Sequence, residues 1–317
     1  MTDWHVFRGN GTPHAGVDHA LGPPPPWRDF SARDKYRGRT YQAGPVEIEM
    51  VNAALWLRRP LLVTGPPGSG KSSLAYAVAH ELELGPVLVW PINSRTTVTE
   101  GLYTYDALGR LREAQLAATR VDRLNDPPDI GRFIRLNALG TAMYPTPRPR
   151  VLLIDEIDKS DIDLTGDLLH VLEEATFEIP ELVQQAPGEV KVYTSDTGVD
   201  RVPLYSGRVQ CQSFPLIILT SNGERELAPA FLRRCLRLNM EPPNEQRLMA
   251  IVAAHLGRTN EELTKSLIQL FIKRQDSNRL MAIDQLLNAI YLVMHGRLAD
   301  DLERSRVVDA LLKELNR

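Results

Sequence analysis

The segment Gly65-Pro66-Pro67-Gly68-Ser69-Gly70-Lys71-Ser72 matches the G-x-x-x-x-G-K-[ST] phosphate loop and indicates the fold class. A short apolar run, 61–63, precedes it and a helix expected over 72–84 follows it. The N–H groups of such a loop and the positive end of the helix converge where phosphates bind. We expect Lys71 to reach the β and γ phosphates and the Ser72 hydroxyl to ligate Mg²⁺, with Ser73 completing the cofactor-binding set. The alternative, a glycine-rich turn, is disfavoured because the pattern arises by chance in about one in a hundred chains of this length.

Short apolar runs alternate with longer amphipathic stretches on both sides of this loop. The runs are 61–63, 87–90, 151–154 and 216–219, with a weaker fifth at 236–240. The first four show no polar alternation, as expected of strands buried on both faces of a parallel sheet. Strands separated by helical stretches indicate crossover connections. The sequence therefore predicts an α/β fold, a P-loop NTPase three-layer αβα core with a parallel sheet.

The run Val151-Leu152-Leu153-Ile154-Asp155-Glu156 ends in two carboxylates and matches the Walker B pattern. Open α/β sheets bind their ligands at the carboxyl ends of parallel strands. We expect Asp155 to hold Mg²⁺ largely through its water shell and Glu156 to polarise the attacking water as general base. An exposed acidic turn is the alternative, and the phosphate loop upstream disfavours it. Asp158 receives no catalytic role and is expected to be a cap or a surface charge.

Asn222 and the pair Arg233-Arg234 complete the candidate catalytic residues. Asn222 follows the fourth run, where it could touch both the γ phosphate and the attacking water, although Asn is also a common turn residue. A guanidinium group matches phosphate oxygens in shape and charge. On charge alone, the alternative that the two arginines are simply solvated is the better interpretation.

The two ends of the chain differ from this α/β part. Residues 1–40 are rich in Gly and Pro and predict a flexible N-terminal arm, whose aromatic residues can dock on the body or on a partner. Residues 41–240 are predicted to form the nucleotide-binding domain, and 241–317 a small all-α lid domain. Within the lid, Asn244 is expected to cap a helix that Gly257 stops, and Thr259 with Glu262 has capping-box spacing for the next. Asp284 is expected to start a third helix.

The composition is that of a globular chain: 317 residues, 43% hydrophobic and 24% charged. The net charge of −3 gives no basic excess, so binding to nucleic acid is not indicated. Cys211 and Cys235 have no metal or disulfide spacing and are expected to be free thiols. The sequence shows no leader segment and no apolar run long enough to span a membrane, so we expect a cytoplasmic protein.

The ordered set of phosphate loop, Asp155-Glu156, Asn222 and Arg233-Arg234 resembles the AAA+ ATPases, and within them looks most like the MoxR-type ATPases. The stretches 153–159, 169–174 and 219–227 carry the second likeness, which covers roughly residues 40–296. The resemblance implies a sensor 1 role for Asn222. It also implies an arginine finger that acts on the ATP of a neighbouring subunit, with Arg234 favoured over Arg233. Arg279 is the best match to a basic sensor 2 residue, although its surroundings lack the proline-and-serine cap of close relatives.

Three further expectations follow from the resemblance. Asn93, just past the second run, resembles the polar residue that restrains the Walker B glutamate, or it is a turn residue. The stretches 94–150 and 175–213 exceed a minimal crossover and are candidate insertions. The second contains alternating segments, 191–193 and 208–210, consistent with the hairpin that MoxR-like proteins carry before sensor 1. Insertions of this kind usually meet the substrate or partner.

The function implied is that of an ATPase that forms a ring, expected to be a homo-hexamer, uses ATP and Mg²⁺, and remodels an unidentified protein partner in a chaperone-like way. One alternative is a nucleotide-gated assembly switch with slow turnover. Another is a nucleic-acid-directed AAA+ translocase, for which turnover stimulated by nucleic acid and a steep salt dependence would be expected. A small-molecule kinase is disfavoured because no acceptor site is visible and the helical lid would be unexplained.

Overall fold

The computed structural model describes residues 6–7, 9–15, 17, 23–118, 129–185, 188–198, 200–257, 260–276, 281–295 and 301–313. The chain divides into two compact units. The first, which we call the helical unit, comprises Met1–Gly44, Gly65–Glu81 and Asn239–Arg317. The second, the sheet unit, comprises Pro45–Thr64 and Leu82–Leu238. The predicted division into an arm, a nucleotide-binding domain and a lid stays a prediction.

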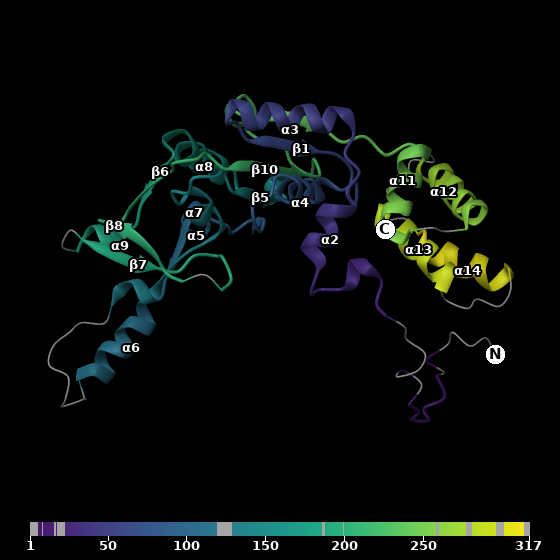
Figure 1. The fold of residues 1–317 in the computed structure, drawn as a ribbon, viewed down its shortest axis with the longest axis horizontal. Helices are drawn as coiled ribbons and strands as arrows, with labels where there is room; N and C mark the ends of the chain where they lie inside the picture. The colour runs from purple at the N-terminus through teal and green to yellow at the C-terminus, as the bar shows by residue number, and fades with distance from the viewer. Residues whose placement is uncertain are drawn as a thin grey trace. The chain divides into compact units, whose positions relative to one another are not determined.

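A five-stranded sheet has the strand order β11-β1-β10-β5-β2. Figure 1 labels β1, β10 and β5 of this sheet. Its strands are β1 (Leu61–Thr64), β2 (Leu88–Pro91), β5 (Val151–Asp155), β10 (Leu216–Ser221) and β11 (Leu236–Asn239). The pairs β1–β10, β10–β5 and β5–β2 are all parallel. All five predicted runs form strands, which confirms the predicted α/β core with a parallel sheet.

Burial follows the position of each strand in the sheet. Every residue of the central strand β10 is buried, and so are the first four of β5. The prediction of continuous burial is wrong for β2, in which buried Leu88 and Trp90 alternate with an exposed Val89. The reason is that β2 is the last strand of the sheet and has one neighbour, so one of its faces stays in part uncovered.

The sheet unit also contains several helices. They are α3 (Pro45–Leu57), α5 (Val98–Leu102), α6 (Ala107–Ala118), α7 (Ala138–Met143), α8 (Ile162–Glu174), α9 (Pro180–Val183) and α10 (Pro229–Leu232), with 3₁₀ turns at η2 (Ile130–Phe133) and η3 (Ile157–Lys159). All six residues of α7 are buried, and its apolar residues lie in the same core as those of β5 and α8. The core therefore extends from the sheet into the first predicted insertion.

The two predicted insertions form one structure. In the first, β3 (Tyr103–Tyr105) pairs antiparallel with β4 (Ile134–Leu136). In the second, β6 (Thr176–Glu178), β7 (Glu189–Val192), β8 (Val202–Tyr205) and β9 (Arg208–Gln210) form a sheet in the order β6-β9-β8-β7. The N–H of Leu136 donates to the carbonyl of Tyr193 over 2.8 Å, and that of Tyr193 to the carbonyl of Ile134 over 3.1 Å. These backbone bonds join the two insertions.

The N-terminal segment of the helical unit is more structured than the arm that the sequence predicted. From Pro23 onward it contains η1 (Pro26–Arg28) and α2 (Arg33–Thr40). Helix α2 packs on α4 (Lys71–Glu81), and a Cβ on Gly38 would lie 2.6 Å from the carbonyl oxygen of Tyr76. The glycine, which suggested a loop, is instead needed for close contact between two helices.

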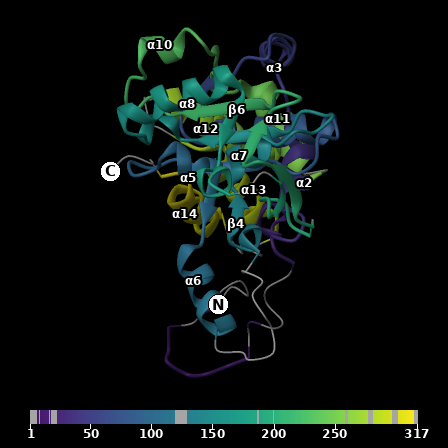
Figure 2. The same ribbon diagram turned by 90° about the vertical axis from the view of Figure 1, so that its left-hand side faces the viewer.

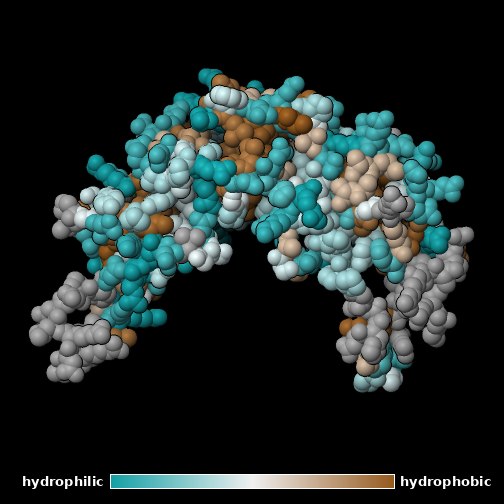
Figure 3. All heavy atoms as spheres, viewed as in Figure 1, coloured by the Kyte–Doolittle hydropathy of each residue, from teal (hydrophilic) through white to brown (hydrophobic). Residues whose placement is uncertain are grey.

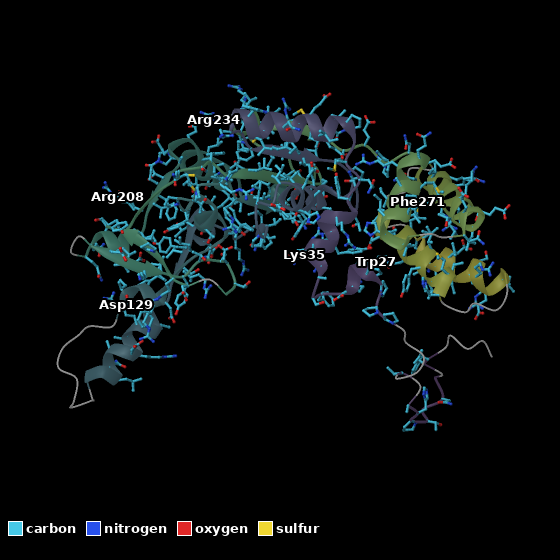
Figure 4. The ribbon with its side chains drawn as sticks, viewed as in Figure 1. Trp27, Lys35, Asp129, Arg208, Arg234 and Phe271 are labelled. Carbon is cyan, nitrogen blue, oxygen red and sulfur yellow. The ribbon has the colours of Figure 1, made fainter. Side chains whose placement is uncertain are left out.

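In the described residues after the sheet, the helices are α11 (Glu245–Leu256), α12 (Glu261–Asp276), α13 (Ile283–His295) and α14 (Asp301–Leu311). Their shared core includes Phe271, which is fully buried (Figure 4). As predicted, Asn244 caps α11 by accepting from the N–H of Arg247, and Gly257 ends the helix. For α12, Asn260 accepts from the N–H of Leu263, while the predicted cap Thr259 lies outside the described residues. No helix in the described part of the chain is long and apolar enough to cross a membrane.

Candidate functional site

The phosphate loop lies in the helical unit, between β1 and α4, and its glycines are required by its geometry. Gly65 and Gly68 have φ values of 148° and 73°. A Cβ on Gly68 would lie 2.3 Å from the Cβ of Ala282, just before α13, and one on Gly65 would lie 2.6 Å from the carbonyl oxygen of Met240. No other residue type fits either place without a shift of the backbone. The pattern that decided the fold is therefore a tightly packed loop.

Lys71 is the first residue of α4, and its side chain turns back over the loop. It is 7% exposed, and its Nζ donates to the carbonyl oxygens of Gly65 and Pro66 over 2.8 and 2.9 Å. A buried ammonium group needs such acceptors, because an unpaired buried charge is costly. The positive charge is thereby held inside the curve of the loop.

Two further side chains bear on whether this loop fits phosphate. The Oγ of Ser69 is buried and makes no hydrogen bond within the described part of the chain. Buried hydroxyls are normally paired, so this one is free to serve an incoming acceptor or donor. Arg37 of α2 donates to Ser73 Oγ over 3.4 Å and lies 4.2 Å above the ring of Tyr76. The start of α4 therefore suits an anion such as phosphate. Around it lie the Ser69 hydroxyl, Lys71 and Arg37, the last reaching it from α2.

The carboxylate edge lies in the sheet unit, at the carboxyl end of β5. The Oγ1 of Thr220 donates to Asp155 Oδ1 over 2.6 Å and accepts from the N–H of Glu156 over 2.9 Å. Thr220 reaches both groups because β10 runs parallel to β5, with Leu219 paired to Ile154. No local pattern signals this role of Thr220, because it depends on the register between two strands that are far apart in the chain.

Glu156 adopts a left-handed backbone conformation, with φ 64° and ψ 48°. Such a conformation is uncommon for residues other than glycine and costs on the order of 1 kcal/mol or more, which makes it a pointer to function. Its Oε2 accepts from Lys159 Nζ over 2.8 Å, and both side chains are about two-fifths exposed, at 43% and 39%. The hydrogen bond to Glu156 raises the pKa of Lys159 above its ordinary value. The hydrogen bond to Glu156 therefore favours the charged form of Lys159.

Asn222 follows β10, and its backbone is held by Asp158, which the sequence predicts to be a cap or a surface charge. Asp158 is 1% exposed, and its Oδ2 accepts from the N–H groups of Asn222 and Glu224 over 3.0 and 2.9 Å. Asp158 therefore acts as a cap, and the surface-charge alternative is wrong. Because Asp158 lies in η3, shortly after the end of β5, it ties the loop after β10 to the carboxylate edge.

Of the two remaining predicted residues, Asn93 lies within the described part of the chain and Arg279 does not. The Oδ1 of Asn93 accepts from the N–H of Arg95 over 2.8 Å, which is the geometry of a turn residue. The carboxylate of Glu156 accepts a hydrogen bond from Lys159. Of the two roles expected for Asn93, the described residues therefore support that of a turn residue. Arg279 lies outside the described residues.

Arg233 and Arg234 are exposed at the end of α10, and they differ in their partners. Arg234 forms an ion pair with Glu173 of α8. The side chain of Arg233 makes no hydrogen bond or ion pair in the part of the chain that the structure describes. Arg59 donates to the backbone carbonyls of both, with a distance of 3.1 Å to that of Arg234. Arg59, which sequence reasoning missed, fixes the turn that carries the two arginines.

Cys211 and Cys235 are free thiols, as predicted. Burial raises the pKa of Cys235 to about 12, against the opposing charges of Arg59 and Arg237. Burial raises the pKa of Cys211 as well. Neither thiol therefore has the lowered pKa of a reactive nucleophile.

Sulfur and imidazole side chains offer no metal site here: no group of three or more His, Cys, Asp or Glu residues in the described ranges could hold a metal. The Ser72 hydroxyl and the Asp155 carboxylate are each the kind of hard oxygen ligand that Mg²⁺ prefers.

Comparison with known families gives a match over most of the sheet unit and the phosphate loop. The model of the AAA domain (dynein-related subfamily) matches residues 60–235, which is more than half of the chain. The matched range contains the phosphate loop, the carboxylate edge, Asn222 and both arginines, and it ends before α11. No curated protein matches the chain.

Proposed function

The chain belongs to the dynein-related subfamily of AAA domains, and we propose that it binds ATP with Mg²⁺ and hydrolyses it as one subunit of a ring. AAA domains generally hydrolyse ATP and are typically oligomeric. The observation that carries the proposal is the phosphate loop, with a buried Lys71 and a Ser69 hydroxyl that has no partner. Both groups point to an anion that the loop is built to receive.

Binding in this proposal is the task of the loop. Lys71 exchanges the carbonyls of Gly65 and Pro66 for the β and γ phosphates, and the loop N–H groups and Ser69 supply further donors. Ser72 and Asp155, the latter largely through water, would hold Mg²⁺, which would neutralise the charge that develops on the phosphates. Thr220 orients Asp155 through its 2.6 Å hydrogen bond. Groups that orient a ligand in this way are often nearly as important as the ligand itself.

Hydrolysis is the task of Glu156 and Asn222. Glu156 accepts a proton from the attacking water, and Asn222 positions that water against the γ phosphate. In the described structure Glu156 is paired with Lys159. We assign to Lys159 the restraining role that the family resemblance had suggested for Asn93. The glutamate must leave this pair before it can act as a base.

The arginine pair acts on the next subunit. Arg234 stays the favoured finger from the resemblance, and its pairing with Glu173 means that it must exchange one anion for another. Arg233 can reach a neighbour without such an exchange. In either case Arg59 sets the position of the turn.

The finer proposal is that the ring is MoxR-like, hexameric, and remodels a protein partner. The fusion of the two insertions supports it, since a projecting structure can pass on motion only if it is firmly attached. Arg150, just before β5, pairs with Asp196 through both of its terminal nitrogens over 2.9 and 2.7 Å, and the side chains are 14% and 16% exposed. This paired, largely buried link ties the second insertion to the strand that carries Asp155.

The decisive experiment is the ATPase rate measured against chain concentration, with the native mass followed in the same samples. We expect the rate per chain to rise as the oligomer forms. A rate that is the same for monomer and oligomer would contradict an arginine supplied by the neighbour. If ATP drives assembly and the assembled form does not turn it over, the assembly-switch alternative replaces remodelling.

A further inference from the structure

The N-terminal segment 23–42, which we call the strap, begins by contacting the helices that follow the sheet. Trp27 of η1 donates its indole N–H to Asn288 Oδ1 of α13 over 3.1 Å. Its ring meets the rings of His255 and Tyr291 edge to face, with centroid distances of 6.1 and 5.6 Å. Figure 4 shows Trp27 beside α13. The start of the strap is therefore anchored on α11 and α13 by an aromatic cluster.

Further contacts hold the rest of the strap on α11, which Figure 2 shows beside α2. The Tyr36 hydroxyl lies 2.8 Å from His255 Nδ1 and 3.1 Å from the carbonyl oxygen of the same residue. Burial lowers the pKa of His255 to about 4 and raises that of Tyr36 to about 12, so both groups are neutral near pH 7. Arg247 of α11 donates to the carbonyl of Gln42 over 2.9 Å. The strap is thus held before, within and after α2.

Helix α2 depends on these contacts because it has few apolar side chains of its own. It carries three arginines and a lysine against one aspartate. Figure 3 shows mainly hydrophilic side chains where α2 reaches the surface. Like charges held close together repel one another, and an anion nearby would relieve that repulsion. The strap therefore keeps a basic helix against α4, whose first turn follows the phosphate loop.

Arg37 is the arginine of α2 that reaches the first turn of α4. Its guanidinium carbon lies 4.2 Å from the centroid of the Tyr76 ring, and a terminal nitrogen donates to Ser73 Oγ over 3.4 Å. Ser73 and Tyr76 are three residues apart and share one face of α4, so Arg37 extends along that face toward the phosphate loop. Stacking on an aromatic ring fixes the plane of a guanidinium group and leaves the donors at its edge accessible.

We propose that Arg37 binds the α-phosphate of the nucleotide, and that the strap positions it by docking on α11 and α13. The inference rests on the proposed function, in which Lys71 takes the β and γ phosphates and Ser72 the Mg²⁺. In that arrangement the α-phosphate is the one left without a cationic side chain. Arg37 meets α4 at Ser73, directly after these two residues. A planar guanidinium group that is always charged matches phosphate oxygens.

A role in packing alone is the competing interpretation of Arg37. Its stacking on Tyr76 would then serve only to hold α2 on α4. A guanidinium group has five N–H donors, however, and within the described residues Arg37 forms no ion pair with a carboxylate. Its 3.4 Å hydrogen bond to Ser73 is longer than is usual for a donor of this kind. A phosphate accounts for the remaining donors, and packing does not.

The test compares Arg37→Ala with Arg39→Ala, which removes the same charge from an exposed position of the same helix. Calorimetry on the full chain with Mg²⁺ measures the affinity for ADP and for a non-hydrolysable ATP analogue, and circular dichroism checks the fold. We expect Arg37→Ala to weaken both nucleotides alike, by about 10- to 150-fold, because both carry the α-phosphate. Arg39→Ala should bind like the wild type. Arg37→Lys keeps the charge without the planar fork and should recover part of the loss.

Positioning by the strap is tested with Trp27→Ala and with the milder Tyr36→Phe, which removes only the hydroxyl at His255. Each should weaken ADP binding in the wild-type background. Neither should weaken it further in the Arg37→Ala background, because the effect acts through Arg37. A purely structural role would lower the unfolding temperature in both backgrounds and give additive losses of affinity.

The outcomes separate the inference from the proposed function. If Lys71→Ala loses nucleotide but Arg37→Ala binds like the wild type, the inference is wrong and the phosphate-loop proposal stands. If the wild type binds no nucleotide, both fail. Weaker binding of the ATP analogue with unchanged ADP affinity would place Arg37 at the γ phosphate and overturn the assignment. Equal losses in Arg37→Ala and Arg39→Ala would show a general effect of charge, and additive losses with Trp27→Ala would overturn positioning by the strap.

Discussion

The phosphate loop and the carboxylate edge differ in the sequence separation between the residues that contact one another in them. In the loop, the Lys71 ammonium is satisfied by carbonyls five and six residues away. At the edge, Asp155 is held by Thr220, 65 residues away. A contiguous segment carries its geometry with it, whereas an assembled set exists only when the sheet register is correct. Substitutions at the loop should therefore act locally, and those at the edge should reveal couplings between distant segments.

The arginine pair is the extreme case of an assembled set. Its turn is held by Arg59, which is more than 170 residues earlier, and one of its guanidinium groups is paired with α8. In the proposed function its target lies on a different copy of the chain. Its effects should consequently be the largest and the most dependent on assembly.

The largest effect is expected from losing the finger. Arg234→Ala or Arg233→Ala should lower turnover by about 10³ to 10⁵, because the charge it stabilises develops only in the transition state. Steady-state ATPase assays measure the loss, and calorimetry should show that ATP binding survives. The variant that does not slow hydrolysis identifies the arginine that is not the finger.

Mixing experiments test whether the finger acts between subunits. Rings of Arg234→Ala and Glu156→Gln chains contain some interfaces with an intact carboxylate edge and an intact finger, so activity should partly return. Each variant alone has no such interface. If mixed rings form, by native mass, and activity never returns, the finger does not act between subunits.

Next in size is the effect of removing the base. Glu156→Gln should lower turnover by about 10² to 10⁴, the usual contribution of a general base, and leave ATP binding intact. Single-turnover kinetics on the assembled protein separates the chemical step from product release. Near wild-type turnover in this variant would show that Glu156 is not the base.

A substitution in the phosphate loop is expected to change the affinity for ATP. Lys71→Ala removes a charged donor and should weaken ATP binding by about 10- to 150-fold, from the roughly 1.5–3 kcal/mol of a hydrogen bond to a charged group. Calorimetry measures the affinity, and circular dichroism confirms the fold. Unchanged affinity in a folded variant would contradict the assignment of the loop to phosphate.

Features formed by neighbouring residues could be predicted from the sequence, and features formed by residues far apart in the chain could not. The phosphate loop, the parallel sheet and the cap at Asn244 were predictable because each is written in neighbouring residues. The exposure of Val89 was not, since it depends on β2 being the last strand of the sheet. The roles of Thr220 and Arg59 come from strand register and from long-range packing, which no local pattern contains.

Helix α2 shows a different reason for failure. Its residues, from Arg33 to Thr40, are mostly charged and include a glycine, so they indicated a flexible arm. Its stability comes from packing on α4 and from Arg37 over the ring of Tyr76. Tertiary contacts outweigh a weak intrinsic preference in such a segment.

At the carboxylate edge, Thr220→Val tests a group that orients a ligand. Losing the hydroxyl frees Asp155 Oδ1 and the N–H of Glu156, which should raise the Mg²⁺ concentration needed for half-maximal ATPase by about 10- to 100-fold. Thr220→Ser keeps the hydroxyl and should stay near the wild type. Equal behaviour of the two variants would mean that Thr220 serves packing alone.

The smallest effect is expected at Lys159, and it separates the two candidates for restraining Glu156. Exposed ion pairs are worth about 0.2–1 kcal/mol, so Lys159→Ala should raise the basal turnover of the assembled protein by no more than about fivefold. The rise is expected because Glu156 must leave the pair before it can polarise water. Lys159→Arg keeps the pair and is the matched control. Asn93→Ala should leave the rate unchanged, since that side chain serves the N–H of Arg95. Added salt should shrink the difference between Lys159→Ala and the wild type, because it screens the pair. Faster turnover in Asn93→Ala alone would return the restraint to Asn93, and slower turnover in Lys159→Ala would make Lys159 part of the chemistry.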